Sequence, residues 1–359
     1  MIAYYVHHHG SGHVHRATAI ARALRTPVVG LSSRTMPEGW PGEWVLLPRD
    51  DSDTAPVDPT AGGTLHWAPL HDTGLRDRTA AIGAVLARDD VRLLVADVSV
   101  EVCLLARLHG VPVAIMAQPG DRTDRPHQLA YDLAARLLAP WPARPDDWPE
   151  SWRVKTVHLG AFSQFDGRRP ADPDPRRVLV LWGGGGLDVG DAQVREAAAA
   201  IPDRRWEIAG PGSAAPGSST SDDPPNLLRL GWVDEVWPAL ERAAVVVTHA
   251  GQNALAEVAA ARRAAVVLPQ DRPHGEQVAT AEALDRAGLA AVATAWPAGP
   301  EWPGLLARAQ EIGGAGWTAW STGGGARRAA AEVDALAAPQ PDVLIGLGPG
   351  SPMLAGHGG

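Results

Sequence analysis

Short runs of apolar residues alternate along the chain with stretches in which Ala, Leu and Arg recur at helical spacing. Alternation of this kind is typical of parallel βα units, in which a helix follows each strand and packs on the sheet. In the first half of the chain we expect strands at 1–6, 27–31, 91–96 and 111–117, and helices at 16–24, 79–87 and 101–109.

A segment without apolar periodicity interrupts this pattern at 161–176. It is rich in Gly, Pro and Asp, which favour turns and loops, so we interpret it as a linker between domains. Beyond it the pattern restarts, with strands expected at 177–182, 206–209, 227–230, 245–248 and 264–268, and helices at 191–200, 236–243, 254–261, 276–287 and 326–336.

The chain is therefore expected to contain two doubly wound α/β domains with parallel sheets, at 1–160 and 177–338. The last expected helix, at 326–336, could pack back on the first domain, and the tail at 339–359 has no interpretable pattern. Because ligands of open α/β sheets bind beyond the carboxyl ends of the strands, the cleft between the two domains is the expected site.

The composition narrows the class of protein. A chain of 359 residues, 45 % hydrophobic and 20 % charged, can bury two cores, and its net charge of −9 argues against a nucleic-acid partner, which requires a basic surface. The single cysteine, Cys103, excludes an intramolecular disulfide and is expected to be a buried, inert thiol. We find no signal peptide and no apolar run near the roughly 18 residues of a transmembrane segment, so we expect a soluble cytoplasmic protein.

A glycine-rich turn, HHHGSGHVHR at 7–16, follows the first expected strand. Glycine allows a tight turn close to a ligand, and the helix N-terminus behind it favours negative charge. His13 lies at this junction and is either a catalytic group facing the cleft or a structural histidine. Five histidines within nine residues also suggest a metal. Consecutive His7, His8 and His9 on a strand would point to alternate faces, however, so no metal site is expected.

Two other strand ends carry candidate groups. Asp97 follows the expected strand at 91–96, and either caps the next helix or orients a histidine as in a catalytic triad. Four glycines follow Trp182, and among them Gly185 and Gly186 could form a nest for phosphate or sugar, with an ordinary loop as the alternative.

The most specific motif is VVVTHAGQNALAE at 245–257, where a strand ends in His-x-Gly-x-Asn and a helix begins. The exposed N–H groups and dipole of that helix, together with His249 and Asn253, could hold a diphosphate without a lysine or a Walker loop. Glu257, one turn further on, is an acceptor suited to ribose hydroxyls.

Together these motifs resemble those of GT-B glycosyltransferases, which use sugar nucleotides and invert the anomeric centre. The likeness is to the MurG-like family 28 and the related UDP-glycosyltransferases, and it covers roughly residues 1–335. It is carried by the GSGH turn at 10–13 and, in the second domain, by GWV at 231–233, THAGQNALAE, LPQ at 268–270 and Glu276-Gln277.

The resemblance implies two Rossmann-like domains that face each other across a cleft, the first binding the acceptor and the second the donor. It makes His13 the general base that deprotonates an acceptor hydroxyl and Asp97 its orienting partner. The diphosphate would be bound by His249, Gly251 and Asn253, the ribose by Glu257, the base by Trp232 and Val233, and the transferred sugar by Glu276 and Gln277. Gly12, Gly185, Gly186 and Gln252 complete the expected donor site.

Three departures from the family pattern leave details of that site open. Plant-type members have Trp and Ser at the positions of Gln252 and Ala254, so one phosphate contact is uncertain. They also have Pro-Gln where this chain has Asp234-Glu235, which leaves the choice between uridine and thymidine open. Glu276 replaces the commoner Asp, which lengthens its reach and affects the choice of sugar.

The sequence therefore predicts a metal-independent, inverting glycosyltransferase that needs no cofactor and moves a sugar from a UDP- or TDP-sugar to a small or lipid-like acceptor. Trp40, Trp44 and Trp67 could line the acceptor site or pack in the core. A UDP-sugar 2-epimerase-like isomerase and a non-catalytic sugar-nucleotide-binding subunit are the alternatives. Peripheral contact with a membrane stays open, and no oligomeric state is predicted.

Overall fold

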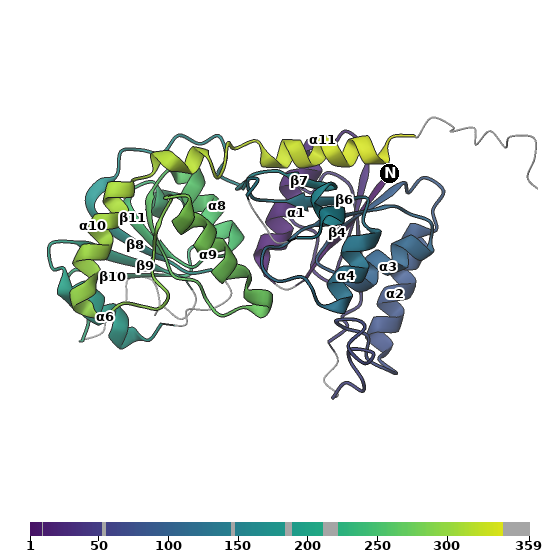
Figure 1. Cartoon of the computed structure of the whole chain (residues 1–359), viewed down its shortest axis with the longest axis horizontal. Coiled ribbons are helices and arrows are strands. Elements are labelled where there is room, and N and C mark those ends of the chain that lie inside the picture. Colours follow the sequence, from purple (N-terminus) through teal and green to yellow (C-terminus); the bar gives the residue numbers. More distant parts are fainter. Residues whose placement is uncertain (9, 52–54, 145–147, 184–188, 211–221, 340–359) are drawn as a thin grey trace, which may run out of the picture.

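The computed structural model describes residues 1–8, 10–51, 55–144, 148–183, 189–210 and 222–339. These residues form two lobes side by side, an N-terminal lobe and a C-terminal lobe, each built on one parallel sheet flanked by helices (Figure 1). The predicted class, two doubly wound parallel-sheet α/β domains, is therefore confirmed. Among the helices that the structure describes, none is long and apolar enough to cross a bilayer.

The N-terminal lobe contains a seven-stranded sheet in the order β3-β2-β1-β4-β5-β6-β7, with every neighbouring pair parallel. Its two central strands are completely buried, as expected for a parallel sheet covered on both faces. The strands are β1 Ile2–Val6, β2 Val28–Ser32, β3 Glu43–Leu46, β4 Leu93–Asp97, β5 Val113–Met116, β6 Arg136–Ala139 and β7 Thr156–His158.

The last helix of the chain, α11 (Gly325–Ala337), belongs to this N-terminal lobe (Figure 1, yellow). Its buried residues Ala329 and Val333 share an apolar core with Ile2 of β1 and Ile20 of α1. The other helices of the lobe are α1 Ser11–Ala23, α2 Thr73–Leu86, α3 Val100–Leu108, α4 Arg125–Leu133 and α5 Glu150–Arg153.

The C-terminal lobe contains a six-stranded parallel sheet in the order β10-β9-β8-β11-β12-β13. The strands are β8 Asp174–Leu181, β9 Arg205–Ala209, β10 Leu227–Gly231, β11 Ala243–Thr248, β12 Ala264–Val267 and β13 Ala291–Val292. The helices are α6 Asp191–Ala200, α7 Trp237–Leu240, α8 Gln252–Ala261, α9 Glu276–Arg286 and α10 Trp302–Ile312, with short 3₁₀ turns at Pro273–Gly275, Gly299–Glu301 and Ala315–Thr318.

Some predicted boundaries differ from those of the structure. Strand β8 begins inside the predicted linker, because Asp174 already pairs with Ala243 of β11. Strand β1 ends at Val6, so the alternation expected for His7 and His8 does not apply. Their rings are instead stacked with centroids 5.0 Å apart, and His9 lies outside the described residues.

The lobes contact each other through side chains and backbone. Arg16 of α1 donates from Nη1 to the Gln252 side-chain oxygen of α8 at 2.7 Å. On the same side, the Asp121 backbone N–H donates to the His274 carbonyl at 2.8 Å. These contacts bring the carboxyl ends of both sheets to a shared cavity, which we call the interlobe cavity.

Candidate functional site

The interlobe cavity has a volume of about 340 Å³ and is lined by residues from both lobes. The segments that follow β8, β9 and β11 form one side of it, and the start of α1 forms the other. Gly185 and Gly186 lie outside the described residues. The other predicted donor residues all line this cavity, together with His13: Gly12, Trp232, Val233, His249, Gly251, Gln252, Asn253, Glu257, Glu276 and Gln277.

Three helices, α1, α8 and α9, begin at this cavity. Each follows a glycine, Gly10, Gly251 or Gly275, and at none of these three described N-termini does a side chain supply a capping hydrogen bond. Their first backbone N–H groups and the positive ends of their dipoles are therefore available to a ligand. Three such termini at one cavity make it suited to an anion, although Glu276 in the first turn of α9 offsets part of the charge.

His13 and Asp97 form a hydrogen-bonded pair at the N-lobe side of the cavity. The ring Nδ1 of His13 lies 3.0 Å from Asp97 Oδ1, and Asp97 is completely buried at the end of β4. Burial opposes ionisation of Asp97, but Arg16 and His13 outweigh it and hold the pKa of this carboxyl well below its usual range. Nδ1 therefore donates to a carboxylate, which leaves His13 Nε2 as the basic nitrogen.

Asp97 is not the cap of the helix that follows it. That position belongs to Ser99, whose hydroxyl accepts from the Val102 N–H at 3.3 Å at the start of α3. Between the two residues, Val98 adopts a left-handed backbone conformation with φ of 62°, which is costly for a β-branched residue. The sharp turn lets Asp97 point toward His13 while Ser99 caps the helix.

Arg16 is a functional candidate that the sequence analysis missed. It is buried in α1, one turn after His13, and its guanidinium donates to both oxygens of Asp97, with the Nε bond at 3.2 Å. Its third nitrogen binds Gln252 across the interlobe boundary. The Nε2 of Gln252 is buried and has no hydrogen-bond partner among the described residues, so it is a donor that a ligand could use.

Gly12 and Asn253 bring the N-termini of α1 and α8 into contact. A methyl group on Gly12 would lie only 1.6 Å from Asn253 Nδ2, so a larger residue would displace that amide. Nearby, the shorter backbone contact of His249 runs from the Gly251 N–H to Nδ1 at 2.9 Å, against 3.4 Å from the Gly183 N–H to Nε2. We assign the ring proton to Nε2 because Nδ1 accepts the shorter bond; in this tautomer the 3.4 Å contact with Gly183 is not a hydrogen bond and Nε2 is a donor.

Glu257 and Trp232, which the resemblance predicts to contact the ribose and the base, both line the interlobe cavity. Burial raises the pKa of Glu257 to about 7, opposed by a hydrogen bond from Gln164. Trp232 is 55 % exposed, and its Nε1 donates to Asp234 at 3.0 Å. An exposed indole held in this way offers a face on which a nucleobase can stack.

Gln277 already has internal partners. Its side-chain oxygen accepts from the N–H groups of Ala250 and Gln270, at 3.1 and 3.0 Å. It therefore holds together the loops that follow β11 and β12, and only its Nε2, 3.4 Å from Gln270 Oε1, could reach a sugar. Glu276 lies 3.5 Å from Arg122 of the other lobe.

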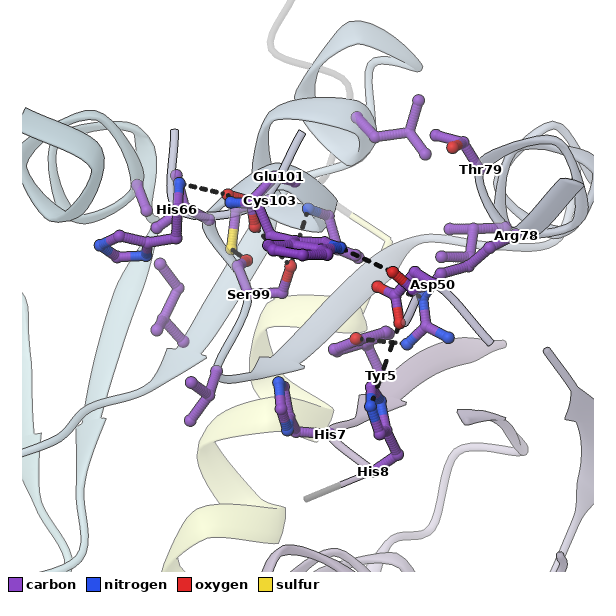
Figure 2. Close-up of a pocket in the computed structure, with 18 of the residues that line it drawn as sticks. Tyr5, His7, His8, Asp50, His66, Arg78, Thr79, Ser99, Glu101 and Cys103 are labelled. Atoms are coloured by element: carbon purple, nitrogen blue, oxygen red, sulfur yellow. Dashed lines mark hydrogen bonds and ion pairs between the residues drawn. The ribbon is translucent and has the colours of Figure 1, made fainter. Parts of the chain in front are cut away.

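A second cavity, which we call the N-lobe cavity, has a volume of about 390 Å³ and a mostly apolar lining (Figure 2). Gln118 lines both cavities, so the two adjoin, and the His7 ring at the edge of the N-lobe cavity lies 5.7 Å from the His13 ring. A hydroxyl compound in the N-lobe cavity would therefore lie near His13.

The polar groups of the N-lobe cavity mostly bind one another. Arg78 donates to the Tyr5 hydroxyl at 2.6 Å, and Trp67 donates to the Asp50 carbonyl at 2.8 Å (Figure 2). Glu101 of α3 accepts from the His66 N–H at 2.8 Å and so holds the loop that carries His66. Sequence reasoning named Trp67 as a candidate for this site but missed Tyr5, Arg78 and Glu101, because they lie on a strand and two helices without a shared motif.

The candidate tryptophans divide between the core and the cavity. Trp40 is buried and packs edge to face against Tyr4 and Trp44, whereas Trp67 lines the N-lobe cavity. Cys103 also lines it and is buried, as expected, and burial raises the pKa of its thiol. The thiol therefore stays protonated and unreactive at neutral pH.

Comparison with known proteins supports the resemblance that the sequence motifs indicate. A profile of the glycosyltransferase family 28 C-terminal domain matches residues 208–297. The UDP-N-acetylglucosamine–N-acetylmuramyl-(pentapeptide) pyrophosphoryl-undecaprenol N-acetylglucosamine transferase of Streptococcus pneumoniae is 26 % identical over 208 residues, which cover 54 % of this chain and 56 % of that enzyme. The chain thus spans about half the length of the curated relatives it matches.

Solved structures resemble the whole fold. The kitacinnamycin glycotransferase has a TM-score of 0.64 at 19 % identity, and Acinetobacter baumannii MurG has 0.59 at 20 %. The calicheamicin glycosyltransferase CalG4 has 0.61 at 16 %, and all three cover 93 % of this chain and 98 % of their own. The comparisons bear out the predicted resemblance: the fold is that of the GT-B glycosyltransferases, and residues 208–297 match the C-terminal domain of glycosyltransferase family 28.

Proposed function

We propose that this chain is an inverting glycosyltransferase that moves a sugar from a nucleoside-diphosphate sugar to a hydroxyl of a small, largely apolar acceptor. One observation carries the proposal: three helix N-termini without side-chain caps meet at the interlobe cavity, beside the His13–Asp97 pair. The first feature suits a diphosphate, and the second suits removal of a proton from a nucleophile.

The donor binds mainly to the C-terminal lobe. Its diphosphate accepts hydrogen bonds from the first N–H groups of α8, from His249 Nε2 and from the amide of Asn253. The base stacks on Trp232, and the ribose hydroxyls bind Glu257. Gln277 keeps the two loops in place, and Glu276 contacts the transferred sugar.

The reaction is a direct displacement. The acceptor oxygen attacks the anomeric carbon from the face opposite the diphosphate, and its proton moves to His13 Nε2. The new bond from oxygen to the anomeric carbon forms as the bond from that carbon to the diphosphate oxygen breaks. Asp97 stabilises the resulting imidazolium, and the α8 N–H groups stabilise the departing diphosphate.

The acceptor occupies the N-lobe cavity. A cavity of about 390 Å³ with a mostly apolar lining fits a compact hydrophobic body with one reacting hydroxyl directed at His13. A whole polyprenyl lipid is too large for the N-lobe cavity, so only its head group could bind in it. This cavity also favours transfer over epimerisation, because an epimerase needs no second pocket beside its base.

A thermal-shift panel of UDP, TDP and GDP with their sugars tests the donor part, because a ligand of the folded state raises the unfolding temperature. We expect one diphosphate to stabilise the protein clearly more than its monophosphate. With the preferred sugar nucleotide and a panel of hydroxylated apolar compounds, a product of inverted anomeric configuration is expected by NMR. An epimer formed from UDP-N-acetylglucosamine alone would support the isomerase instead, and binding without any product would support a non-catalytic subunit.

A further inference from the structure

Four potential metal ligands gather where the two lobes meet, and two of them, His66 and His127, also line the N-lobe cavity. His66, Asp124, His127 and His274 each offer a ligand atom, and these atoms all lie within 4.8 Å of one another. His66 Nε2 is 2.8 Å from one oxygen of Asp124, and His127 Nδ1 is bonded to the other. His274 Nδ1 lies 4.0 Å from that second oxygen.

The cluster spans both lobes. His66 lies on the loop before α2, Asp124 and His127 lie at the start of α4, and His274 comes from the 3₁₀ turn before α9. His274 has a left-handed backbone with φ of 62°, and its carbonyl is held by the Asp121 N–H. The fold therefore keeps a strained residue of one lobe against three polar residues of the other.

The chemistry of the set suits a zinc-type ion. Imidazole nitrogen and carboxylate oxygen bind zinc at about 2.0–2.2 Å, which places tetrahedral ligands roughly 3.3 Å apart. Contacts within the cluster already approach this spacing, so small side-chain rotations would complete it.

Arg122 is a positively charged neighbour of the cluster. Arg122 Nη1 lies 3.3 Å from His127 Nε2, while its Nη2 donates to the Pro119 carbonyl at 2.8 Å. If a metal bound Nδ1 of His127, the ring proton would be on Nε2. Arg122 would then lose its contact with that nitrogen but keep its hydrogen bond to the Pro119 carbonyl. Among the groups that act on His274, Arg122 disfavours a positive charge, whereas Asp124 and Asp121 favour one.

We propose that His66, Asp124, His127 and His274 bind one divalent transition-metal ion of the zinc class and that this ion joins the two lobes. The ion acts as a structural clasp between the lobes. Because Glu276 follows His274 by two residues at the start of α9, the bound metal also fixes the helix end that faces the donor. The inference rests on these ligands alone and stands whether or not the chain transfers sugar.

Cobalt substitution on protein without a polyhistidine tag tests the site directly. We expect one equivalent of Co²⁺ to give the intense visible absorption of a tetrahedral nitrogen and oxygen site, and excess Zn²⁺ to displace it. Zn²⁺ should also raise the unfolding temperature of the unmodified chain. Weak absorption of the octahedral type, or no saturation at one equivalent of Co²⁺, would overturn the proposal. Both measurements use the unmodified chain, so they do not depend on the folding of a variant.

Variants on each lobe then test whether the ion joins the lobes. His66→Asn and His274→Asn should each weaken Co²⁺ binding at least tenfold and abolish the Zn²⁺ effect on unfolding. His71→Asn is the matched control, because His71 is exposed and has the same φ of 62° as His274. His7→Asn tests the separate histidine run. If only His66→Asn or only His7→Asn reduces binding, the metal belongs to one lobe and the clasp is refuted.

Discussion

The interlobe cavity and the N-lobe cavity adjoin, yet they are built by different means. The first is lined by helix N-termini, and its candidate residues come from four short segments, at 12–13, 232–233, 249–257 and 276–277. The second has a mostly apolar lining, contributed by strands, loops and helices that are far apart in the chain. A diphosphate is common to all nucleoside-diphosphate sugars and can be bound by backbone N–H groups, whereas an acceptor is recognised by the shape of a pocket.

The polar groups of the two cavities differ in the same way. In the interlobe cavity, Gln252 Nε2 and the first N–H groups of α8 remain for a ligand. In the N-lobe cavity, Arg78 and Glu101 are already bound by Tyr5 and by the loop at His66. We infer that charge selects the donor and shape selects the acceptor, and the following substitutions test that division.

The largest expected effect comes from His13→Ala. Loss of a general base should reduce the rate of transfer by about 10²–10⁴-fold, while nucleotide affinity measured by calorimetry stays nearly unchanged. His109→Ala, at an exposed position away from both cavities, should keep full activity. Loss of nucleotide binding in His13→Ala would mean that this residue binds the donor and is not the base.

Removing Arg16 should destabilise the protein. In Arg16→Met the completely buried Asp97 loses its main partner, and an uncompensated buried charge costs about 3–5 kcal/mol of unfolding free energy. The double variant Arg16→Met/Asp97→Asn should recover most of that loss in urea titrations. Arg22→Met, at an exposed arginine of the same helix, should change stability by less than about 0.5 kcal/mol. An equal loss in the single and double variants would contradict the assignment.

Gly12→Ala should weaken donor binding by displacing Asn253. The new methyl group would occupy the place of the Asn253 amide, and loss of one hydrogen bond to a charged phosphate corresponds to about 1.5–3 kcal/mol, or roughly ten- to hundredfold in affinity. Gly304→Ala in α10 introduces the same methyl group where nothing lies within 4 Å, so it should leave the dissociation constant unchanged. Unchanged affinity in Gly12→Ala would show that Asn253 does not contact the donor.

The smallest effect is expected from a substitution that changes acceptor binding only. Leu75→Trp adds bulk to the wall of the N-lobe cavity and should raise the KM for the acceptor several-fold without changing donor affinity. Leu108→Trp, at a residue that is 85 % exposed, is the control and should alter neither. If Leu75→Trp instead weakened donor binding and left the acceptor KM unchanged, the donor would have to bind in the N-lobe cavity and the acceptor in the interlobe cavity.

The sequence predicted best those elements whose apolar runs are continuous and fully buried. The central strands β4 and β11 were found within a few residues, because parallel strands covered on both faces need such runs. The edge strand β3 was missed, since its four residues are all exposed or half-buried. Helix α4 was missed as well, because its first residues, Arg-Pro-His, carry no apolar periodicity.

The same distinction holds for the candidate site. The turn at His13 and the motif at His249 were identified because a ligand-binding helix N-terminus is encoded in consecutive residues. The role of Arg16 could have been suspected from its spacing of three from His13, which places both on one helix face. The cluster around Asp124 could not be predicted, because its ligands meet only when the two lobes pack together.

A crystal structure with UDP bound tests the central claim most directly. Our account predicts diphosphate oxygens within hydrogen-bonding distance of the backbone N–H groups of Gln252 and Asn253, with His13 on the facing lobe turned toward the sugar position. UDP bound outside the interlobe cavity, or with its diphosphate directed away from the start of α8, would contradict it.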